Sequence, residues 1–328
     1  MYRQILIHPD DWKYQCILWR CTLLALVCVY QLLTVTYGLA CAPFLAIRTL
    51  KQLAHDEQSR YPQGAITLRE DTYVDDVVSG ANTLARAIAK QTELCGLCTV
   101  GGFPHQKWAA NDEEVLSGIP PEHRLHHEPH SWENDSFSTL ELLWHPNEDT
   151  FAFAIHPRTV TEYTKRRVLS ETARLFDPLG WLAPVVIRAK ILIQSAWLPA
   201  ADALCWRSFL EELPLLSRLR VNRWLGSGDE DAQAELHGFA DASERGYAAA
   251  VYLRITRIGT VAIHLLAAKS KVAPVRQVSL PRLELTAADL LISLTCHTRS
   301  TLRLFTAPTF LWSDSQVTLK WIQGHASR

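Results

Sequence analysis

The sequence predicts an α/β protein with more than one domain. Its 328 residues exceed what one small domain normally needs, and 48% hydrophobic with 20% charged residues excludes a mainly disordered or low-complexity chain. Short β-branched segments alternate with amphipathic ones along the chain, which is typical of mixed helix and sheet. The 33 basic and 34 acidic residues nearly cancel, so the total charge does not by itself indicate a protein that binds nucleic acid.

Cysteine usage and one uncharged run bear on the compartment. Eight irregularly spaced cysteines predict reduced thiols inside a cell, in the cytoplasm or the nucleus. No charged residue occurs from Cys21 to Ile47, which is long enough to span a bilayer. Polar residues and Gly38 interrupt the run, so we expect two buried strands followed by the start of a buried helix, and no membrane partner.

The first predicted domain covers residues 1–111. Strands are expected at Tyr2–Ile7, Gln15–Trp19 and Tyr30–Tyr37, and a helix is expected to begin at Ala42-Pro43 because proline favours a first turn. Residues 66–68 and 73–78 are β-rich, residues 82–94 have a helical period, and Gly101-Gly102 ends the unit.

The second predicted domain covers residues 112–228. A polar segment rich in proline and histidine comes first, followed by strands at Leu140–Trp144 and Phe151–Ile155 and then by helices. Three patterns in this part of the chain or just before it could each be a functional site or could be purely structural. The pair Cys95 and Cys98 fits half a zinc or redox site but is expected to be structural, and the histidines are expected to lie in a solvated loop. For the cations, phosphate contact and a solvated helix face are equally supported. The histidines are His123, His126, His127 and His130, and the cations are Lys165, Arg166 and Arg167.

The third predicted domain covers residues 229–328 and follows a Gly/Asp-rich linker. Its expected order is strand, strand, strand, helix, strand, and this order brings the ends of separate elements to one edge of a sheet. The expected strands are residues 236–240, 247–253, 260–268 and 309–313, and the expected helix is residues 282–294.

Acidic residues interrupt apolar runs at two places. Asp75 and Asp76 lie between β-branched residues, as at the tip of a hairpin, where two like charges are costly unless a cation binds them. Asp241 and Asp314 each end a strand, and Glu284 lies on the predicted helix. Three converging carboxylates could hold metal ions that align water with a phosphodiester. The plain alternatives are a solvated turn for the pair and unrelated surface acids for the other three.

Several short motifs, taken in their order, resemble the Pol polyprotein of the BEL/Pao family of LTR retrotransposons. They are Met1-Tyr2-Arg3-Gln4-Ile5, Leu33-Thr34-Val35-Thr36-Tyr37-Gly38, Ala42-Pro43-Phe44-Leu45-Ala46, Tyr73-Val74-Asp75-Asp76, Lys107-Trp108-Ala109, Phe176-Asp177-Pro178-Leu179-Gly180 and Leu280-Pro281-Arg282-Leu283-Glu284-Leu285. The resemblance implies an α/β chain with a partial reverse transcriptase palm of α+β type, a thumb and connection region, and an incomplete ribonuclease H-like domain.

The resemblance also implies roles for single residues. Asp75 and Asp76 match the palm aspartates, and Asp241, Glu284 and Asp314 match the ribonuclease H acids; both sets would bind Mg²⁺ or Mn²⁺. Nucleotide contacts would come from Tyr2, Gly38, Pro43, Phe44 and Lys107. The implied partners are an RNA template, a DNA primer, an RNA–DNA hybrid and deoxynucleotides.

Two departures from the family pattern weaken the expectation of a working enzyme. The first palm aspartate would fall four residues before Met1, and the last ribonuclease H acid would fall beyond Arg328. Since two-metal catalysis depends on bridging carboxylates, polymerisation by this chain alone is not expected. The alternative is a non-enzymatic product of a decayed or co-opted element, with nucleic-acid binding at most.

Overall fold

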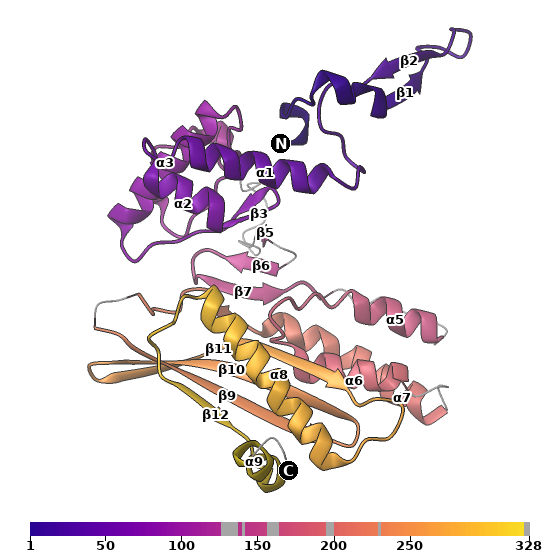
Figure 1. Cartoon of the computed structure of the whole chain (residues 1–328), viewed down its shortest axis with the longest axis vertical. Helices are drawn as coiled ribbons and strands as arrows, with labels where there is room; N and C mark the ends of the chain where they lie inside the picture. Colours follow the sequence, from indigo (N-terminus) through magenta and orange to yellow (C-terminus); the bar gives the residue numbers. More distant parts are fainter. Residues whose placement is uncertain (126–136, 140–141, 156–163, 195–199, 229–230, 325–328) are drawn as a thin grey trace. The chain divides into compact units, whose positions relative to one another are not determined.

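The computed structural model describes residues 1–125, 137–139, 142–155, 164–194, 200–228 and 231–324. The chain divides into two compact units. The first contains residues 1–135 and 146–148, and the second contains residues 136–145 and 149–328. Figure 1 labels their elements.

The first unit is mainly helical. Its helix α2 packs closely on α3, because Gly64 has no side chain: a Cβ there would lie 2.8 Å from the backbone of Glu93. Leu50, Leu68 and Leu97 fill the core between the helices. The elements are η1 (Tyr2–Gln4), η2 (Pro9–Tyr14), β1 (Cys16–Trp19), β2 (Cys28–Gln31), α1 (Ala42–Asp56), α2 (Pro62–Glu70), β3 (Thr72–Tyr73), β4 (Asp76–Val77), α3 (Leu84–Val100), α4 (Glu113–Leu116) and η3 (Pro121–His123).

Two predicted strands of this unit are wrong. Residues 2–4 form a 3-10 helix, and only a single bridge between Leu6 and Thr34 follows it. Residues 66–68 lie inside α2, where Ala65 and Leu68 are buried three positions apart on the face that meets α3. In α2 the local β propensity is overridden by tertiary packing.

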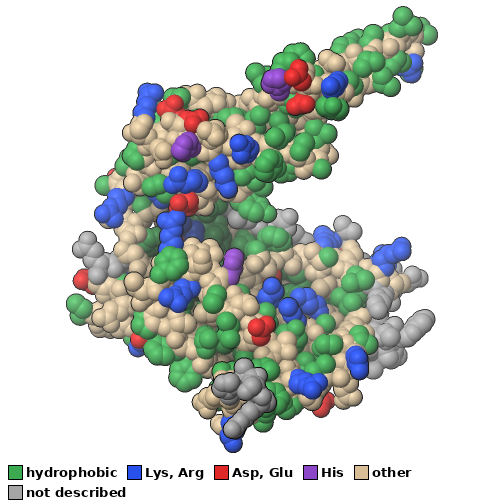
Figure 2. Space-filling model, viewed as in Figure 1, with side chains coloured by type: hydrophobic (Ala, Val, Ile, Leu, Met, Phe, Trp, Pro, Cys, Tyr) green, Lys and Arg blue, Asp and Glu red, His purple; other side chains and the backbone are tan. Residues whose placement is uncertain are grey.

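The uncharged run also differs from its prediction. Its first part forms the hairpin of β1 and β2, whose residues are all exposed rather than buried. At the tip, Leu23 is 83% exposed and Leu24 is 100% exposed. Figure 2 shows these apolar side chains gathered over the hairpin. No helix in the described part of the chain is long and apolar enough to cross a membrane.

The second unit holds two four-stranded sheets. One is antiparallel in the order β5-β6-β7-β8, and the other has the order β11-β10-β9-β12. The elements are β5 (Phe137–Thr139), β6 (Leu142–His145), β7 (Thr150–Phe153), α5 (Lys165–Ala173), α6 (Ala183–Gln194), α7 (Ala200–Glu212), η4 (Leu213–Arg218), β8 (Val221–Asn222), β9 (Gln233–Ser243), β10 (Gly246–Arg257), β11 (Thr260–Val272), α8 (Leu280–Thr301), β12 (Thr309–Trp312) and α9 (Gln316–Gln323).

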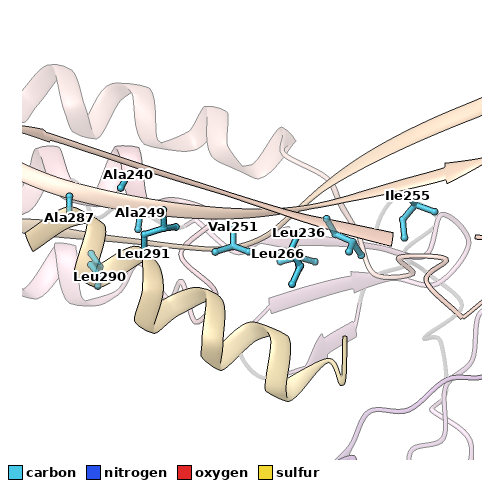
Figure 3. Packing of buried hydrophobic residues seen from close by; sticks show 10 residues of the cluster. Leu236, Ala240, Ala249, Val251, Ile255, Leu266, Ala287, Leu290 and Leu291 are labelled. Carbon is cyan, nitrogen blue, oxygen red and sulfur yellow. The ribbon is translucent and has the colours of Figure 1, made fainter. Parts of the chain in front are cut away.

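The sheet of β9 to β12 confirms the order predicted for the last third of the chain. Strands β9, β10 and β11 are antiparallel neighbours, and β12 pairs in parallel with β9 after the helix α8 has crossed over. Figure 3 shows the core between this sheet and α8, where Leu236, Val251 and Leu291 meet. Gly238 lets α8 approach, because a Cβ there would lie 2.7 Å from Leu291.

The outer edge of this sheet, β11, is covered by the chain segment that leads into α6. The backbone N–H of Ala268 donates to the Leu179 carbonyl at 2.8 Å, and the Trp181 indole donates to the Leu265 carbonyl at 3.0 Å. Such cover removes an open edge that would otherwise pair with other strands. The sequence-based division into residues 1–111, 112–228 and 229–328 stays a prediction.

Candidate metal centre

Three acidic side chains meet at one end of the β9–β12 sheet. Asp241 lies near the end of β9, Asp314 follows the end of β12, and Glu284 lies in the first turns of α8. The parallel pairing of β9 and β12 brings their carboxyl ends to the same edge, and α8 packs across β9 and β10. One ligand oxygen from each carboxylate lies within 4.8 Å of the others. The structure therefore brings together the three acids that the sequence singled out in this region.

The three carboxylates differ in environment. Asp241 and Asp314 are exposed, whereas Glu284 is only 8% exposed. Burial raises the pKa of Glu284, the negative charges of Asp241 and Asp314 raise it further, and a hydrogen bond from the Ala242 N–H opposes the rise. The Oε2 atom of Glu284 is buried and has no hydrogen-bond partner among the described residues.

This arrangement fits a divalent cation. A buried carboxylate oxygen without a partner is costly, and three close negative charges repel one another. A hard cation bound by carboxylate oxygens would satisfy the oxygen and offset the repulsion. Oxygen donors suit both Mg²⁺ and Mn²⁺, so the donor set does not choose between them.

The acids of the first unit are placed differently. Asp75 and Asp76 are exposed in a tight hairpin, in which Tyr73 pairs with Asp76 across the turn. Val74 occupies the turn at φ +58°, a left-handed conformation that a β-branched residue rarely adopts. Within the described residues, Asp75 and Asp76 belong to no group of three or more potential metal ligands.

The base of this hairpin is held by a polar network. The backbone N–H of Val78 donates to the Asp71 carbonyl at 3.1 Å, and the Ser79 hydroxyl donates to the Asp71 carboxylate. Lys90, from α3, donates to Ser79 Oγ at 3.0 Å and lies 3.7 Å from Asp71. These contacts fix the orientation in which the turn leaves α2 and enters the segment before α3.

The predicted nucleotide-contact residues lie in three places. Tyr2 packs edge to face against Tyr37, with ring centroids 4.9 Å apart, and Gly38 turns the chain at φ +88°. Pro43 and Phe44 begin α1, and Phe44 is 64% exposed. Lys107 is exposed at φ +61°. No contact described for this unit joins Pro43, Phe44 or Lys107 to the aspartate turn.

The remaining chemical patterns show no site in the described residues. Cys98 is buried on α3, and burial raises its pKa to about 12, as expected of a structural thiol. His123 ends η3, whereas His126, His127 and His130 lie outside the described residues. Arg166 and Arg167 are exposed at the start of α5.

Sequence reasoning missed one partner of the acid cluster. The Ala242 N–H binds the Glu284 carboxylate, and a backbone group leaves no signal in the residue type. The family motif around Asp177 also proves to be structural. Its carboxylate accepts a hydrogen bond from the Leu182 N–H at 2.9 Å, which holds the turn that enters α6.

Known proteins resemble the chain in two ways. Residues 164–315 match the family described as Pao retrotransposon-like RNaseH-like domain. Among solved structures, a foamy viral protease-reverse transcriptase in complex with double-stranded DNA superposes with a TM-score of 0.57 at 12% identity. That match covers 98% of this chain and 50% of the viral one, so the chain spans about half the length of that structure.

No curated protein sequence matches the chain. At 12% identity the viral structure establishes a shared fold, that of a reverse transcriptase, and not an activity. The family match falls on the region that holds the acid cluster, from α5 to the residue after Asp314. Residues 164–315 are therefore similar to the Pao retrotransposon-like RNaseH-like domain, and the chain as a whole shares the fold of the viral structure, as a fragment of a retrotransposon Pol protein would.

Proposed function

We propose that the second unit cleaves the RNA strand of RNA–DNA hybrids by metal-dependent phosphodiester hydrolysis. The observation that carries this proposal is the convergence of Asp241, Glu284 and Asp314 to within 4.8 Å, in the region that matches an RNaseH-like domain. Because its partners would be nucleic acids inside a cell, we expect the protein to be located in the cytoplasm or the nucleus.

The three side chains would divide the work of holding the cation. Glu284 is the fixed ligand, because burial on α8 and the Ala242 N–H hold its carboxylate in place. Asp241 and Asp314 are exposed, so they face the side from which a phosphodiester can approach. Bound Mg²⁺ or Mn²⁺ supplies a nucleophilic water and stabilises charge on the leaving oxygen.

The test is cleavage of a labelled RNA–DNA hybrid by the full chain in Mg²⁺ or Mn²⁺. Asp314→Asn removes one ligand, and we expect activity to fall by more than about 100-fold, since even indirect supporting contacts of metal ligands are worth 10–100-fold. The matched control is Asp289→Asn, which makes the same substitution at an exposed position of α8 away from the cluster. Equal cleavage by both variants would refute the proposal.

For the first unit we infer descent from a reverse transcriptase palm. Asp75 and Asp76 would be the two metal ligands of the turn, and the nucleotide would contact the residues named for that role: Tyr2, Gly38, Pro43, Phe44 and Lys107. The partners would be an RNA template, a DNA primer and deoxynucleotides.

Two carboxylates do not complete a two-metal site, so we do not expect this chain to polymerise DNA by itself. A primer-extension assay with Mg²⁺ or Mn²⁺ tests this expectation. Template-dependent incorporation that is lost in Asp76→Asn would contradict it.

The other candidate is a non-enzymatic product of a retroelement that only binds nucleic acid. The same hybrid assay separates the two candidates. If neither the unchanged chain nor Asp289→Asn cleaves the hybrid, while both still bind it, the second candidate is supported.

A further inference from the structure

Two lysines on β11 form an exposed basic ridge close to the acid cluster. Lys269 and Lys271 are both exposed, and no ion pair is described for either. The residue between them, Ser270, is buried and donates a hydrogen bond to the Ala183 carbonyl at the start of α6. Side chains alternate along a strand, so the two lysines point to the face opposite α6.

The strand register confirms which face this is. Lys269 lies opposite Ala249 on β10, and Lys271 lies opposite Tyr247. Ala249 and Tyr247 both contact the core that α8 covers. Directly opposed residues of an antiparallel pair share a face, so the basic ridge (Lys269 and Lys271) lies on the α8 face of the sheet.

The same register sets the level of the basic ridge along the sheet. Lys271, Tyr247 and Ala242 are direct neighbours across β11, β10 and β9. The Ala242 N–H binds the Glu284 carboxylate, so Lys271 lies at the level of the acid cluster. Two strand spacings of about 4.8 Å put its backbone roughly 10 Å from that of Ala242.

We propose that Lys269 and Lys271 bind the phosphate backbone of the nucleic-acid duplex whose scissile phosphate lies at the acid cluster. The inference rests on the proposed function and names the surface that would hold its substrate. Two exposed cations at the level of a metal site match a polyanion, and roughly 10 Å of separation lets them reach phosphates other than the one being cleaved. Tyr247, half-buried on β10 between Lys271 and Ala242, offers a flat surface beside the sugar–phosphate chain.

An exposed lysine on the other face of the sheet provides a comparison for the basic ridge. Lys190 is also exposed, but it lies on α6, which packs against the opposite side of β11. Lys190 and the basic ridge therefore lie on opposite faces of the sheet, so a duplex that contacts the ridge along the α8 face does not reach Lys190. Lys190→Gln is therefore the matched control, with the same substitution and the same loss of charge.

The experiment is fluorescence anisotropy of a labelled RNA–DNA hybrid titrated with the full chain in EDTA, so that binding is measured without cleavage. Each phosphate contact contributes about 0.9 to the magnitude of the slope of log K against log salt concentration. Relative to 1 M salt, one such contact therefore raises the affinity at 0.1 M salt by about eightfold. We expect Lys269→Gln and Lys271→Gln each to weaken binding by about eightfold and to lower the slope by about 0.9, and Lys190→Gln to change neither. The double variant should lose about 60-fold.

Two further variants test whether the positive charge is responsible and whether binding is independent of cleavage. Lys269→Arg/Lys271→Arg retains the charge, so it should restore both affinity and slope if the ridge contacts phosphate. Wild-type affinity and slope in the double glutamine variant, or equal losses in Lys190→Gln, would overturn the inference. Asp314→Asn should keep its binding in EDTA. A chain that binds through the ridge but never cleaves would therefore refute the proposed function and leave this inference standing.

Discussion

Replacing Glu284 by glutamine should make the protein more stable when no metal is present. The glutamine keeps the size of the side chain and can still accept the Ala242 hydrogen bond, but it removes the buried negative charge that faces Asp241 and Asp314. Most substitutions of buried residues destabilise a fold, so an increase in stability would be specific to the repulsion we describe.

The geometry sets the size of the effect. At 4.8 Å two like charges repel by about 3.5 kcal/mol at an effective dielectric constant of 20, and by about 0.9 kcal/mol in water. Asp241 and Asp314 are exposed, so the lower value applies to each of the two pairs that include Glu284. The expected gain is therefore about 2 kcal/mol, or about 4–8 °C in melting temperature for a unit of this size.

The sign with pH follows from the raised pKa of Glu284. The folded protein holds this proton more tightly than the unfolded chain, so stability falls as pH rises from the ordinary value of 4.5 through the raised one. The advantage of Glu284→Gln should be full above that range. The advantage should disappear well below pH 4.5, where Glu284 of the wild type is protonated and is as neutral as the glutamine of the variant.

Thermal unfolding in EDTA and in MgCl₂ provides the measurement. In EDTA, Glu284→Gln should melt above the wild type; with Mg²⁺ the wild type should gain stability by binding the ion, and the variant should gain little. A variant that melts below the wild type in EDTA would show that contacts of the Glu284 carboxylate outweigh its repulsion by Asp241 and Asp314, and would refute this prediction.

Three other outcomes follow from described contacts. Glu235→Gln should lower the free energy of unfolding, since Glu235 accepts a hydrogen bond from Arg254 at 2.7 Å that lowers the pKa of its carboxyl group. Urea unfolding should show this loss of stability at neutral pH, and the loss should vanish as pH falls through the lowered pKa. Gly180→Ala should cost at least about 3 kcal/mol in the same urea assay, because a Cβ at φ +75° would lie 1.6 Å from a β11 carbonyl oxygen. Cys98 should resist thiol reagents at pH 8 while the exposed Cys205 reacts, as site-resolved mass spectrometry would show, because burial raises its pKa to about 12; labelling of Cys98 in the folded protein would contradict its placement.

Much of the second unit could be predicted from the residues in order. Strands β9 and β10 have alternating buried positions, and α8 has a proline in its first turn and buries one face. Such patterns reflect a sheet and a helix that each hide one side from water, so they are readable without coordinates. They also place Asp241 and Asp314 at strand ends.

The errors fall where packing overrides local preference. Residues 66–68 are β-rich, yet α2 forms because Ala65 and Leu68 meet α3. The apolar hairpin of β1 and β2 was expected to be buried, but among the described residues nothing covers it. A sequence shows how apolar a segment is, but not whether another part of the chain lies against it.

The order of residue types already indicates which residues could do chemistry: acids at the ends of strands, an acid on a helix and paired aspartates in a turn. That three of these acids form a group follows from the folded structure alone. Three features each join residues far apart in the chain: the parallel pairing of β9 with β12, the burial of Glu284 on α8, and the register that sets Lys271 level with the cluster. Composition and periodicity carry no information about such pairings, because they arise from strand order and from the hydrogen bonds between strands.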